Sequence, residues 1–457
     1  MQILFRALLS LAVLIIYIRL GKKAAGSLKL SRLNLISVSF YYMLLENLAG
    51  GTLIYVGLRE HYLVQKIANP EVIDKTYYII AYTLIMFCVT VIAVNKIFSR
   101  RSPEYNFEKF IHKPVLCRKD MTGAQAGTIL MMMVCFGATG YVFAKLGYIP
   151  ITRMVTSSSY AIAVMRQGAN KNFTGNQYIK NILMNNLTPF ISYYAYIWYR
   201  ATGSRTWRQI WIVLLVLSIL VVTYDFSKAP LVFYLISYYL INIFMGFVND
   251  NRQFVKFSVA AVLIIIFFYA FMLHADLDLN IYGGPVGRVL FTQIATLFLH
   301  VETFPARHPY LMGASFYKWF APIIPNATMR RSARVVMETF NPAGVAEDTA
   351  GVMNTLFVGE AYANFGIAGV IVAPIIFGVI IGVASNVLRS SRKTPEIVLL
   401  YLFFTNSFSH MIEGGFIDIF YNASYILVPL YIFWLVISSN SHYSVPKYST
   451  KKGSALA

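Results

Sequence analysis

The feature that most constrains this chain is a series of apolar segments, each about 20 residues long, that recur along most of its length. A helix of that length crosses the hydrocarbon layer of a bilayer, roughly 30 Å thick, and satisfies its own backbone hydrogen bonds. The sequence is 58% hydrophobic and only 13% charged, whereas a soluble domain carries about 25% charged residues. We therefore predict an all-α, polytopic integral membrane protein.

About eleven segments are apolar enough to be predicted as transmembrane helices. They are residues 2–20, 33–57, 77–98, 124–147, 178–199, 209–224, 229–248, 254–273, 364–388, 396–412 and 423–439. The turn 225–228 is so short that the two segments beside it could instead form one re-entrant element. We predict that residues 1–457 form a single membrane domain.

Lysine and arginine residues are concentrated in alternate loops, and this asymmetry predicts the orientation of the chain. The basic loops hold Lys22, Lys23, Lys29 and Arg32; Arg100, Arg101, Lys109, Lys113, Arg118 and Lys119; Arg200, Arg205 and Arg208; Arg252; and Arg389, Arg392 and Lys393. Basic loops favour the cytoplasm, so we predict an external N-terminus and a cytoplasmic C-terminus. The net charge of +20 then indicates membrane lipid as a partner, and not nucleic acid.

A long segment, residues 274–363, falls on the predicted external side. Loops of this length without structure are uncommon unless they are functional. Within it, residues 287–303 place apolar side chains on one helical face and polar ones on another, which predicts an amphipathic helix at the membrane surface or over a cavity. Residues 305–326 combine prolines with aromatics, which is typical of a rigid, irregular cap.

The predicted external regions also carry cations that the topology does not require. These are Arg153, Arg166, Lys171, Lys228, Arg288, Arg307, Lys318, Arg330, Arg331 and Arg334. Several converging cations would hold a pyrophosphate, because guanidinium groups bind phosphate oxygens in pairs; alternatively, each meets an anionic lipid headgroup. Lys228 lies between two apolar segments, where a charge is costly unless it is partnered or functional.

Candidate acids and bases lie on the same predicted side. They are Asp225, Asp276, Asp278, His300, His308, Glu338, Glu347, Asp348 and Glu360. Glu360, close to the next membrane helix, could act as a general base or bind a sugar hydroxyl, or it could pair with an arginine. His274, Asp276 and Asp278 are too isolated to predict a metal site, and the three cysteines indicate no disulfide framework. We predict neither a metal nor a cofactor.

Residues 350–369, AGVMNTLFVGEAYANFGIAG, resemble the segment before a late membrane helix in Wzy-type oligosaccharide repeat-unit polymerases, the O-antigen polymerases of bacteria. The similarity is carried by Asn354-Thr355, Glu360, Tyr362, Asn364-Phe365-Gly366 and Gly369. Weaker similarities are Arg166 before Gly168, Gly287-Arg288, and Ser227-Lys228-Ala229-Pro230. Related proteins often have Ser-Arg-Gly in that last turn, so Lys228 keeps the charge there but lacks the guanidinium fork.

The resemblance implies a metal-independent glycosyltransferase that joins oligosaccharide repeats carried on undecaprenyl pyrophosphate, at the outer face of the bacterial inner membrane. A chain-length regulator is a partner that follows from the same resemblance. We expect Arg166, Lys228 and Arg288 to stabilise the pyrophosphate, with Asn354 and Tyr362 also binding substrate. The expected catalytic base is Glu360 or His300.

Two other functions remain open from the sequence. An O-antigen ligase uses the same donor and a similar topology but delivers glycan to a lipid A core. A flippase or other transporter would place charges along a path through the bilayer, and Glu46 and Lys228 are the residues that favour it. Against a transporter, most polar residues gather on the predicted external side.

Overall fold

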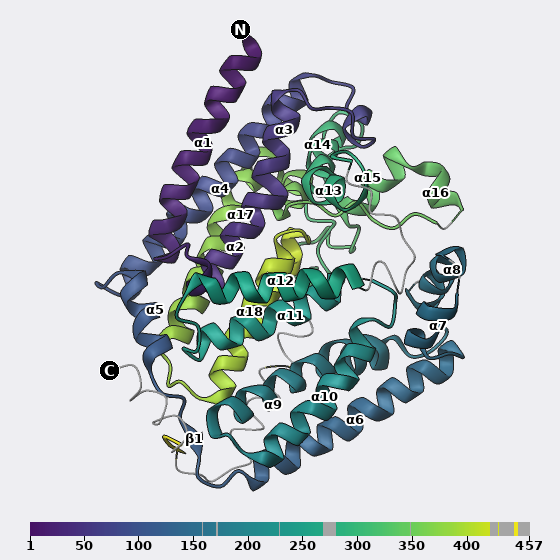
Figure 1. Cartoon of the computed structure of the whole chain (residues 1–457). Helices are drawn as coiled ribbons and strands as arrows, with labels where there is room; N and C mark the ends of the chain where they lie inside the picture. The colour runs from purple at the N-terminus through teal and green to yellow at the C-terminus, as the bar shows by residue number, and fades with distance from the viewer. Residues whose placement is uncertain are drawn as a thin grey trace.

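The computed structural model describes residues 1–157, 159–170, 172–227, 229–267, 280–347, 349–420, 428 and 443–446, and these are overwhelmingly helical (Figure 1). Five described helices are long and apolar enough to cross a membrane: α1 (Gln2–Ala25), α4 (Glu71–Phe98), α6 (Thr122–Leu146), α10 (Arg205–Val222) and α17 (Phe357–Ser390). Helix α11 (Ala229–Phe244) is apolar but shorter. The prediction of a helical membrane protein is supported, whereas the count of about eleven spans stays a prediction.

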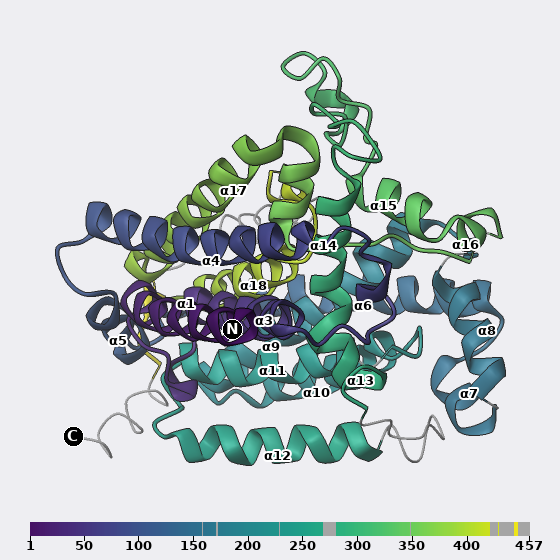
Figure 2. The ribbon, with the colours of Figure 1, turned by 90° about the horizontal axis from the view of Figure 1, so that it is seen from above.

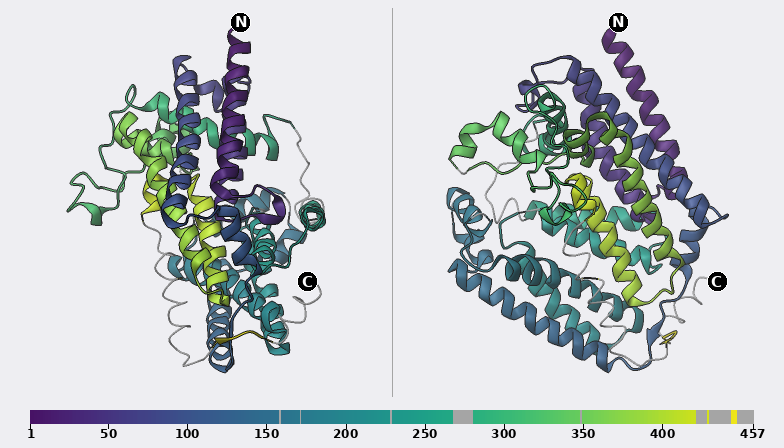
Figure 3. Two further views of the ribbon diagram at one scale, coloured as in Figure 1. Left: turned by 90° about the vertical axis from the view of Figure 1, so that its left-hand side faces the viewer. Right: turned by 180° about the vertical axis from the view of Figure 1, so that it is seen from behind.

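Three of the long helices, α1, α4 and α17, run side by side in the same direction. Arg6 of α1 forms an ion pair of 2.8 Å with Asp74 near the start of α4, and the Asn95 side chain near the end of α4 donates to the Ala24 carbonyl. Figure 3 shows α1, in purple, alongside α4, in blue. Glycines at 378 and 382 of α17 allow its backbone to approach Thr90 and Val94 closely.

The chain between α1 and α4 returns through α2 (Leu35–Met43), the π-helical turn η2 (Leu44–Ala49) and α3 (Gly50–Val56). Asn34 caps α2 by accepting hydrogen bonds from the backbone nitrogens of Ile36 and Ser37, as expected of an asparagine at this position. The Tyr17 hydroxyl of α1 donates to the Phe40 carbonyl, which fixes α2 against α1.

A second group of helices contains α6, the π-helical turn η4 (Ile179–Leu187), α9 (Thr188–Thr202) and α10. Trp198 of α9 stacks on Trp207 of α10 with ring centroids 5.1 Å apart. Between the two groups lie α11 and α18 (Pro395–Met411), as Figure 1 shows. Helix α12 (Asn251–Phe267) packs against α11 on the outside of the helices (Figure 2). Helix α18 contacts both α2 and α9, so it joins the two groups.

The remaining elements are short. They are η1 (Leu30–Arg32), η3 (Val64–Lys66), α5 (Pro103–His112), α7 (Pro150–Thr156), α8 (Ser159–Asn170), α13 (Gly284–Gly287), η6 (Arg288–Thr292), α14 (Gln293–Thr303), η7 (Lys318–Phe320), α15 (Ser332–Phe340), α16 (Pro342–Ala346), η8 (Phe416–Ile419), and the strands β1 (Cys117–Arg118) and β2 (Tyr443–Ser444). The two strands pair antiparallel.

Loops from distant parts of the sequence meet at two opposite ends of the helices. At one end, which we call the basic end, Arg32 pairs with Glu108 at 2.6 Å and Lys393 donates to the Ile111 carbonyl at 2.8 Å. At the other, which we call the loop end, Lys66 donates to the Phe340 carbonyl at 2.8 Å. The predicted cytoplasmic loops are thus joined at the basic end and the predicted external loops at the loop end.

The predicted amphipathic helix over 287–303 forms as η6 and α14, but the prediction that it lies at the surface is wrong for α14. Every residue from Ile294 to Thr303 is buried, because the helix packs between α3, α4, α15 and α17. Its polar face is satisfied inside the protein: the Thr296 hydroxyl donates to the Asn354 carbonyl at 2.6 Å. The loop between α14 and α15 projects away from the helices (Figure 2), with Trp319 and Ile323 exposed.

Candidate functional site

Three charged side chains meet at the loop end and form what we call the Arg331 centre, made of Glu360, Arg331 and Asp418. The Arg331 guanidinium lies 3.0 Å from a Glu360 carboxylate oxygen. It also donates two parallel hydrogen bonds, of 2.9 and 2.8 Å, to the two oxygens of Asp418. Glu360 is 3% exposed, whereas Asp418 is 27% exposed. One carboxylate therefore lies in the interior and the other reaches an accessible surface.

Backbone groups hold both carboxylates in place. The Ile417 nitrogen donates to Glu360 at 3.2 Å, and the Gly415 nitrogen donates to Asp418 at 2.8 Å. A Cβ atom at Gly415 would collide with the Arg331 guanidinium and the Glu360 carboxylate. The tight Gly-Gly turn after α18 is therefore required for the centre to form.

Residues of the segment 350–369 brace this centre from the other side. Asn364 donates to the Glu360 carbonyl at 2.8 Å and to the Ser315 hydroxyl at 3.0 Å. Its side-chain oxygen accepts from the Gly313 nitrogen at 3.0 Å. Gly366 adopts a φ of 60° and a ψ of −139°, so α17 bends there, and a residue with a Cβ atom would be strained. The Asn-Phe-Gly sequence thus ties α17 to the loop 311–316.

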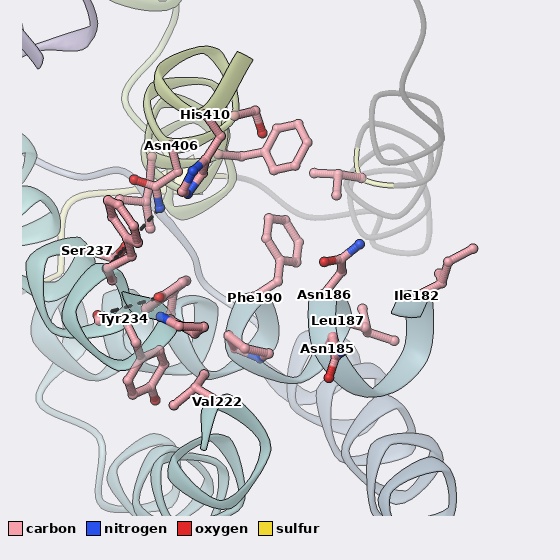
Figure 4. Close-up of a pocket in the computed structure, with 18 of the residues that line it drawn as sticks. Ile182, Asn185, Asn186, Leu187, Phe190, Val222, Tyr234, Ser237, Asn406 and His410 are labelled. Carbon is pink, nitrogen blue, oxygen red and sulfur yellow. Dashed lines mark hydrogen bonds between the residues drawn. The ribbon is translucent and has the colours of Figure 1, made fainter. Parts of the chain in front are cut away.

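A cavity of about 700 Å³ adjoins the Arg331 centre, and Asp418 is one of its lining residues. Its walls come from η4, α9, α11 and α18, with single contributions from α6 and α10. Figure 4 shows side chains from these helices directed into the common space. The cavity thus lies between the second group of helices and the helices α11 and α18.

The lining of the cavity is mostly apolar and aromatic, with uncharged polar groups between. The aromatic residues are Phe190, Tyr193, Phe233, Tyr234 and Phe403; the amides are Asn185, Asn186 and Asn406. Asn406 donates to the Ser237 hydroxyl at 2.8 Å. His410 and Asp418 supply an imidazole and a carboxylate to the described lining. Such a surface suits a sugar, whose ring faces stack on aromatics and whose hydroxyls bond to amides.

His300, one of the two predicted catalytic residues, lies in the interior, with no exposed surface. Its Nδ1 is 2.8 Å from the Thr296 carbonyl and its Nε2 is 3.3 Å from the Ser332 hydroxyl. Burial lowers the pKa of His300 to about 4, so the ring is neutral near pH 7. Ser332 directly follows Arg331, so His300 supports the start of α15.

Two predicted substrate-binding residues are hydrogen-bonded to α14 or to the residue after it. Tyr362 is buried; it accepts a hydrogen bond of 2.7 Å from Lys75 and donates one of 3.0 Å to the Phe304 carbonyl. Asn354 is exposed, and its carbonyl accepts from Thr296. Neither belongs to the cavity lining, although both flank the segment that positions Glu360.

The two predicted pyrophosphate-binding cations that the structure describes, Arg166 and Arg288, lie on different elements. Arg166 is exposed on α8, which is fixed to the turn before α11 by a 3.2 Å hydrogen bond from Asn170 to Asp225. Arg288 is exposed on η6, which packs against η2 and α3. Within the described ranges neither arginine forms an ion pair. Lys228 lies outside the described residues, as do His274, Asp276, Asp278 and Asp348.

Asp418 and His410 are the site residues that sequence reasoning missed. His410 lies within the predicted span 396–412 and Asp418 in the short turn after it, so neither belongs to the predicted external loops in which site residues were sought. A usable signal was the sequence Glu-Gly-Gly-Phe-Ile-Asp directly after residue 412: a carboxylate beyond a glycine turn at a helix end. In the part of the chain that the structure describes, no three metal-ligating side chains come together.

No family model matches this chain, and neither a curated protein nor a solved structure shows significant similarity to it.

Proposed function

We propose that this protein is a membrane glycosyltransferase that polymerises oligosaccharide repeats carried on undecaprenyl pyrophosphate. The observation that carries the proposal is that Asp418 lines a 700 Å³ aromatic and amide-rich cavity while Arg331 holds it beside Glu360. Glu360 belongs to the segment that resembles the polymerases. The segment that carries the resemblance and this cavity thus meet at one guanidinium, that of Arg331.

The Arg331 centre has two carboxylates for one guanidinium and is therefore suited to activating a hydroxyl, not to binding pyrophosphate. In the proposed step, an acceptor sugar hydroxyl attacks the anomeric carbon of the donor, and Asp418 takes the hydroxyl proton. The bond between that carbon and the pyrophosphate oxygen breaks, and its electron pair leaves with the lipid pyrophosphate. Glu360 and Arg331 position Asp418 and stay out of the proton transfer.

Arg166 and Lys228 would stabilise the departing pyrophosphate. Arg166 lies on α8, and Lys228 lies in the turn that leads to Pro230, which lines the cavity. Preorganised cations at a developing negative charge supply the electrostatic stabilisation that a metal provides in other enzymes. We retain Arg288, Asn354 and Tyr362 as candidate contacts for the longer polymer or the lipid.

The wider setting belongs to the same proposal. The basic end would face the cytoplasm and the loop end the periplasm, because lysine and arginine favour cytoplasmic loops. The chain would then lie in the bacterial inner membrane with about eleven spans and an external N-terminus. A chain-length regulator would contact its periplasmic loops.

The deciding experiment is a lipopolysaccharide ladder from a strain that lacks this gene, complemented with wild type or with Asp418→Asn. We expect wild type to restore a long ladder and Asp418→Asn to leave core plus one repeat. Glu338→Gln is the matched control, since Glu338 is an exposed carboxylate at the same end, paired with Arg334. Immunoblots of membranes would show that each variant is inserted.

The other outcomes separate the rival functions. A deletion strain whose core carries no repeat at all would identify a ligase, because a ligase attaches even single repeats. A long ladder from Asp418→Asn, together with loss of the ladder in His410→Gln, would assign the base to His410. An unchanged ladder in the deletion strain would contradict the O-antigen proposal.

A further inference from the structure

A recess of about 560 Å³ lies at the basic end, on the opposite side of the bundle from the proposed active site. The last turns of α1 and α4, the following loop and the first turn of α5 enclose it. Six cationic residues line it: Arg19, Lys22, Lys23, Lys96, Arg100 and Arg101. One carboxylate, Glu104, is also present.

The positive charge of this recess is not balanced by the protein. Among the described residues, none of the six cations forms an ion pair, whereas nearby cations outside the recess do: Arg32 with Glu108, and Arg118 with Glu396. Arg101 is oriented by the Tyr105 ring, with the guanidinium carbon 4.5 Å from its centroid. Like charges this close repel one another, so the recess is suited to an anion.

The recess is built into the fold. Gly26 ends α1 with a φ of +84°, and a Cβ atom there would collide with the backbone of Pro103 and Glu104. The start of α5 can therefore lie directly against α1. Asn95 adds a second tie, because its side chain donates to the Ala24 carbonyl at 2.9 Å and accepts from Asn386 at 2.7 Å.

Apolar surface leads into the recess along the two helices that form it. On α1 the exposed side chains are Ile15, Ile16 and Ile18, and on α4 they are Val89, Ile97 and Phe98. A soluble anion would leave this apolar surface exposed to water, whereas the acyl chains of a lipid would cover it. The combination of an unbalanced basic recess with adjoining apolar surface matches an amphiphile with an anionic head.

We propose that the recess binds the phosphate headgroup of an anionic phospholipid, with the acyl chains lying along α1 and α4. Basic pockets between membrane helices on the cytoplasmic side bind such headgroups. Lys22, Lys23 and Lys96 also offset the partial negative charge at helix C-termini, but Arg19, Arg100 and Arg101 exceed that need. The proposal depends on membrane character alone and is independent of the glycosyltransferase assignment.

Native mass spectrometry of the full-length protein in detergent tests it, with phosphatidylglycerol, phosphatidylcholine or inorganic phosphate added. We expect wild type to retain phosphatidylglycerol, and Arg19→Gln/Lys22→Gln/Arg100→Gln to retain at least about tenfold less, because each cation in the recess attracts the anionic headgroup. Arg205→Gln/Arg208→Gln is the control, since these two exposed cations start α10 outside the recess. A thermal melt with each additive shows that every variant is folded.

Equal retention of phosphatidylglycerol by wild type and the recess variant would overturn the proposal, as would an equal loss in the control. Wild-type retention of phosphatidylcholine at the same level would show that only acyl chains bind. If inorganic phosphate raised the melting temperature of wild type as much as phosphatidylglycerol does, the ligand would be a free phosphate and the lipid assignment would be wrong. A single-site variant, Arg19→Gln, repeats the test if the triple variant does not fold.

Discussion

Arg331 donates two parallel hydrogen bonds, of 2.9 and 2.8 Å, to the carboxylate of Asp418. The two residues are 87 positions apart in the sequence. Their ion pair therefore joins the long loop to the turn after α18. A guanidinium can hold a planar carboxylate in this way while its third nitrogen faces another partner; here that partner is Glu360, at 3.0 Å. The orientation of Asp418 towards the cavity thus depends on two neighbouring guanidinium nitrogens, which lysine lacks.

Replacing Arg331 should therefore be costly. We expect Arg331→Met to destabilise the protein by about 3 kcal/mol, because removing one member of a buried ion pair leaves Glu360 charged and unpaired. Arg334→Met, on the same helix α15, should change stability by about 1 kcal/mol or less, because its ion pair with Glu338 is exposed. Thermal unfolding of both variants in detergent would compare them. If Arg331→Met and Arg334→Met were equally stable, Arg331 would not be the residue that holds the centre together.

Arg331→Lys separates charge from geometry at the same position. The variant keeps the positive charge but cannot hold Asp418 by two parallel bonds. We expect the membrane level of the protein to stay closer to wild type than for Arg331→Met, while polymer length falls to that of Asp418→Asn. Wild-type polymer from Arg331→Lys would show that the bidentate geometry is unimportant.

Gly415→Ala should disrupt the site without removing any charge. The new methyl group would collide with Arg331 and Glu360, so the turn must move and Asp418 must lose its bond from the Gly415 nitrogen. Gly137→Ala is the matched control, because no atom lies within 4 Å of a Cβ placed there. We expect loss of long polymer in the first variant and a normal ladder in the second. If Gly415→Ala and Gly137→Ala gave the same ladder, the Arg331 centre would not depend on the tight turn at Gly415.

The two exposed arginines should differ in their importance for polymerisation. Arg166 lies on α8, which is fixed to the turn before the cavity-lining Pro230, whereas Arg288 lies on η6 beside α3. We expect Arg166→Ala to shorten the polymer more than Arg288→Ala, with both variants inserted normally. The ladder assay ranks them. Full-length polymer from both would remove the proposed pyrophosphate site.

The sequence predicted the helical character and long apolar helices, five of which are described, because apolar segments of this length follow directly from the physics of the bilayer. The count of about eleven spans stays a prediction. The alternation of lysine and arginine likewise predicted which loops share an end, as the contacts of Arg32, Lys66 and Lys393 show. Neither signal depends on how helices pack against one another.

The site was predicted less well, because tertiary packing decides it. Glu360 was open to two interpretations, and only the fold shows that it pairs with Arg331. The helix over 293–303 looked amphipathic, yet its polar side chains Thr296 and His300 bond to Asn354 and Ser332, which no local pattern predicts. Asp418 became a candidate only once the cavity placed it beside helices that are distant in the sequence.

The buried imidazole of His300 should make stability depend on pH in a defined window. Burial lowers its pKa to about 4, from about 6.5 in an unfolded chain. Below pH 6.5 the unfolded chain takes up a proton that the folded protein resists, so stability is fully present above pH 6.5 and is lost as the pH falls towards 4. The loss amounts to about 3 kcal/mol.

His300→Gln tests this window, because glutamine preserves a polar side chain and does not titrate. We expect the stability difference between wild type and the variant to shrink or reverse as the pH is lowered from 7 to 4, measured by thermal unfolding in detergent. Taking the difference cancels the contribution of other titrating groups to stability. One of them is His61, because burial lowers its pKa as well. A difference that stays constant across this range would mean that His300 does not resist protonation. In that case a catalytic role for the imidazole, rather than support of α15, would again be the better interpretation.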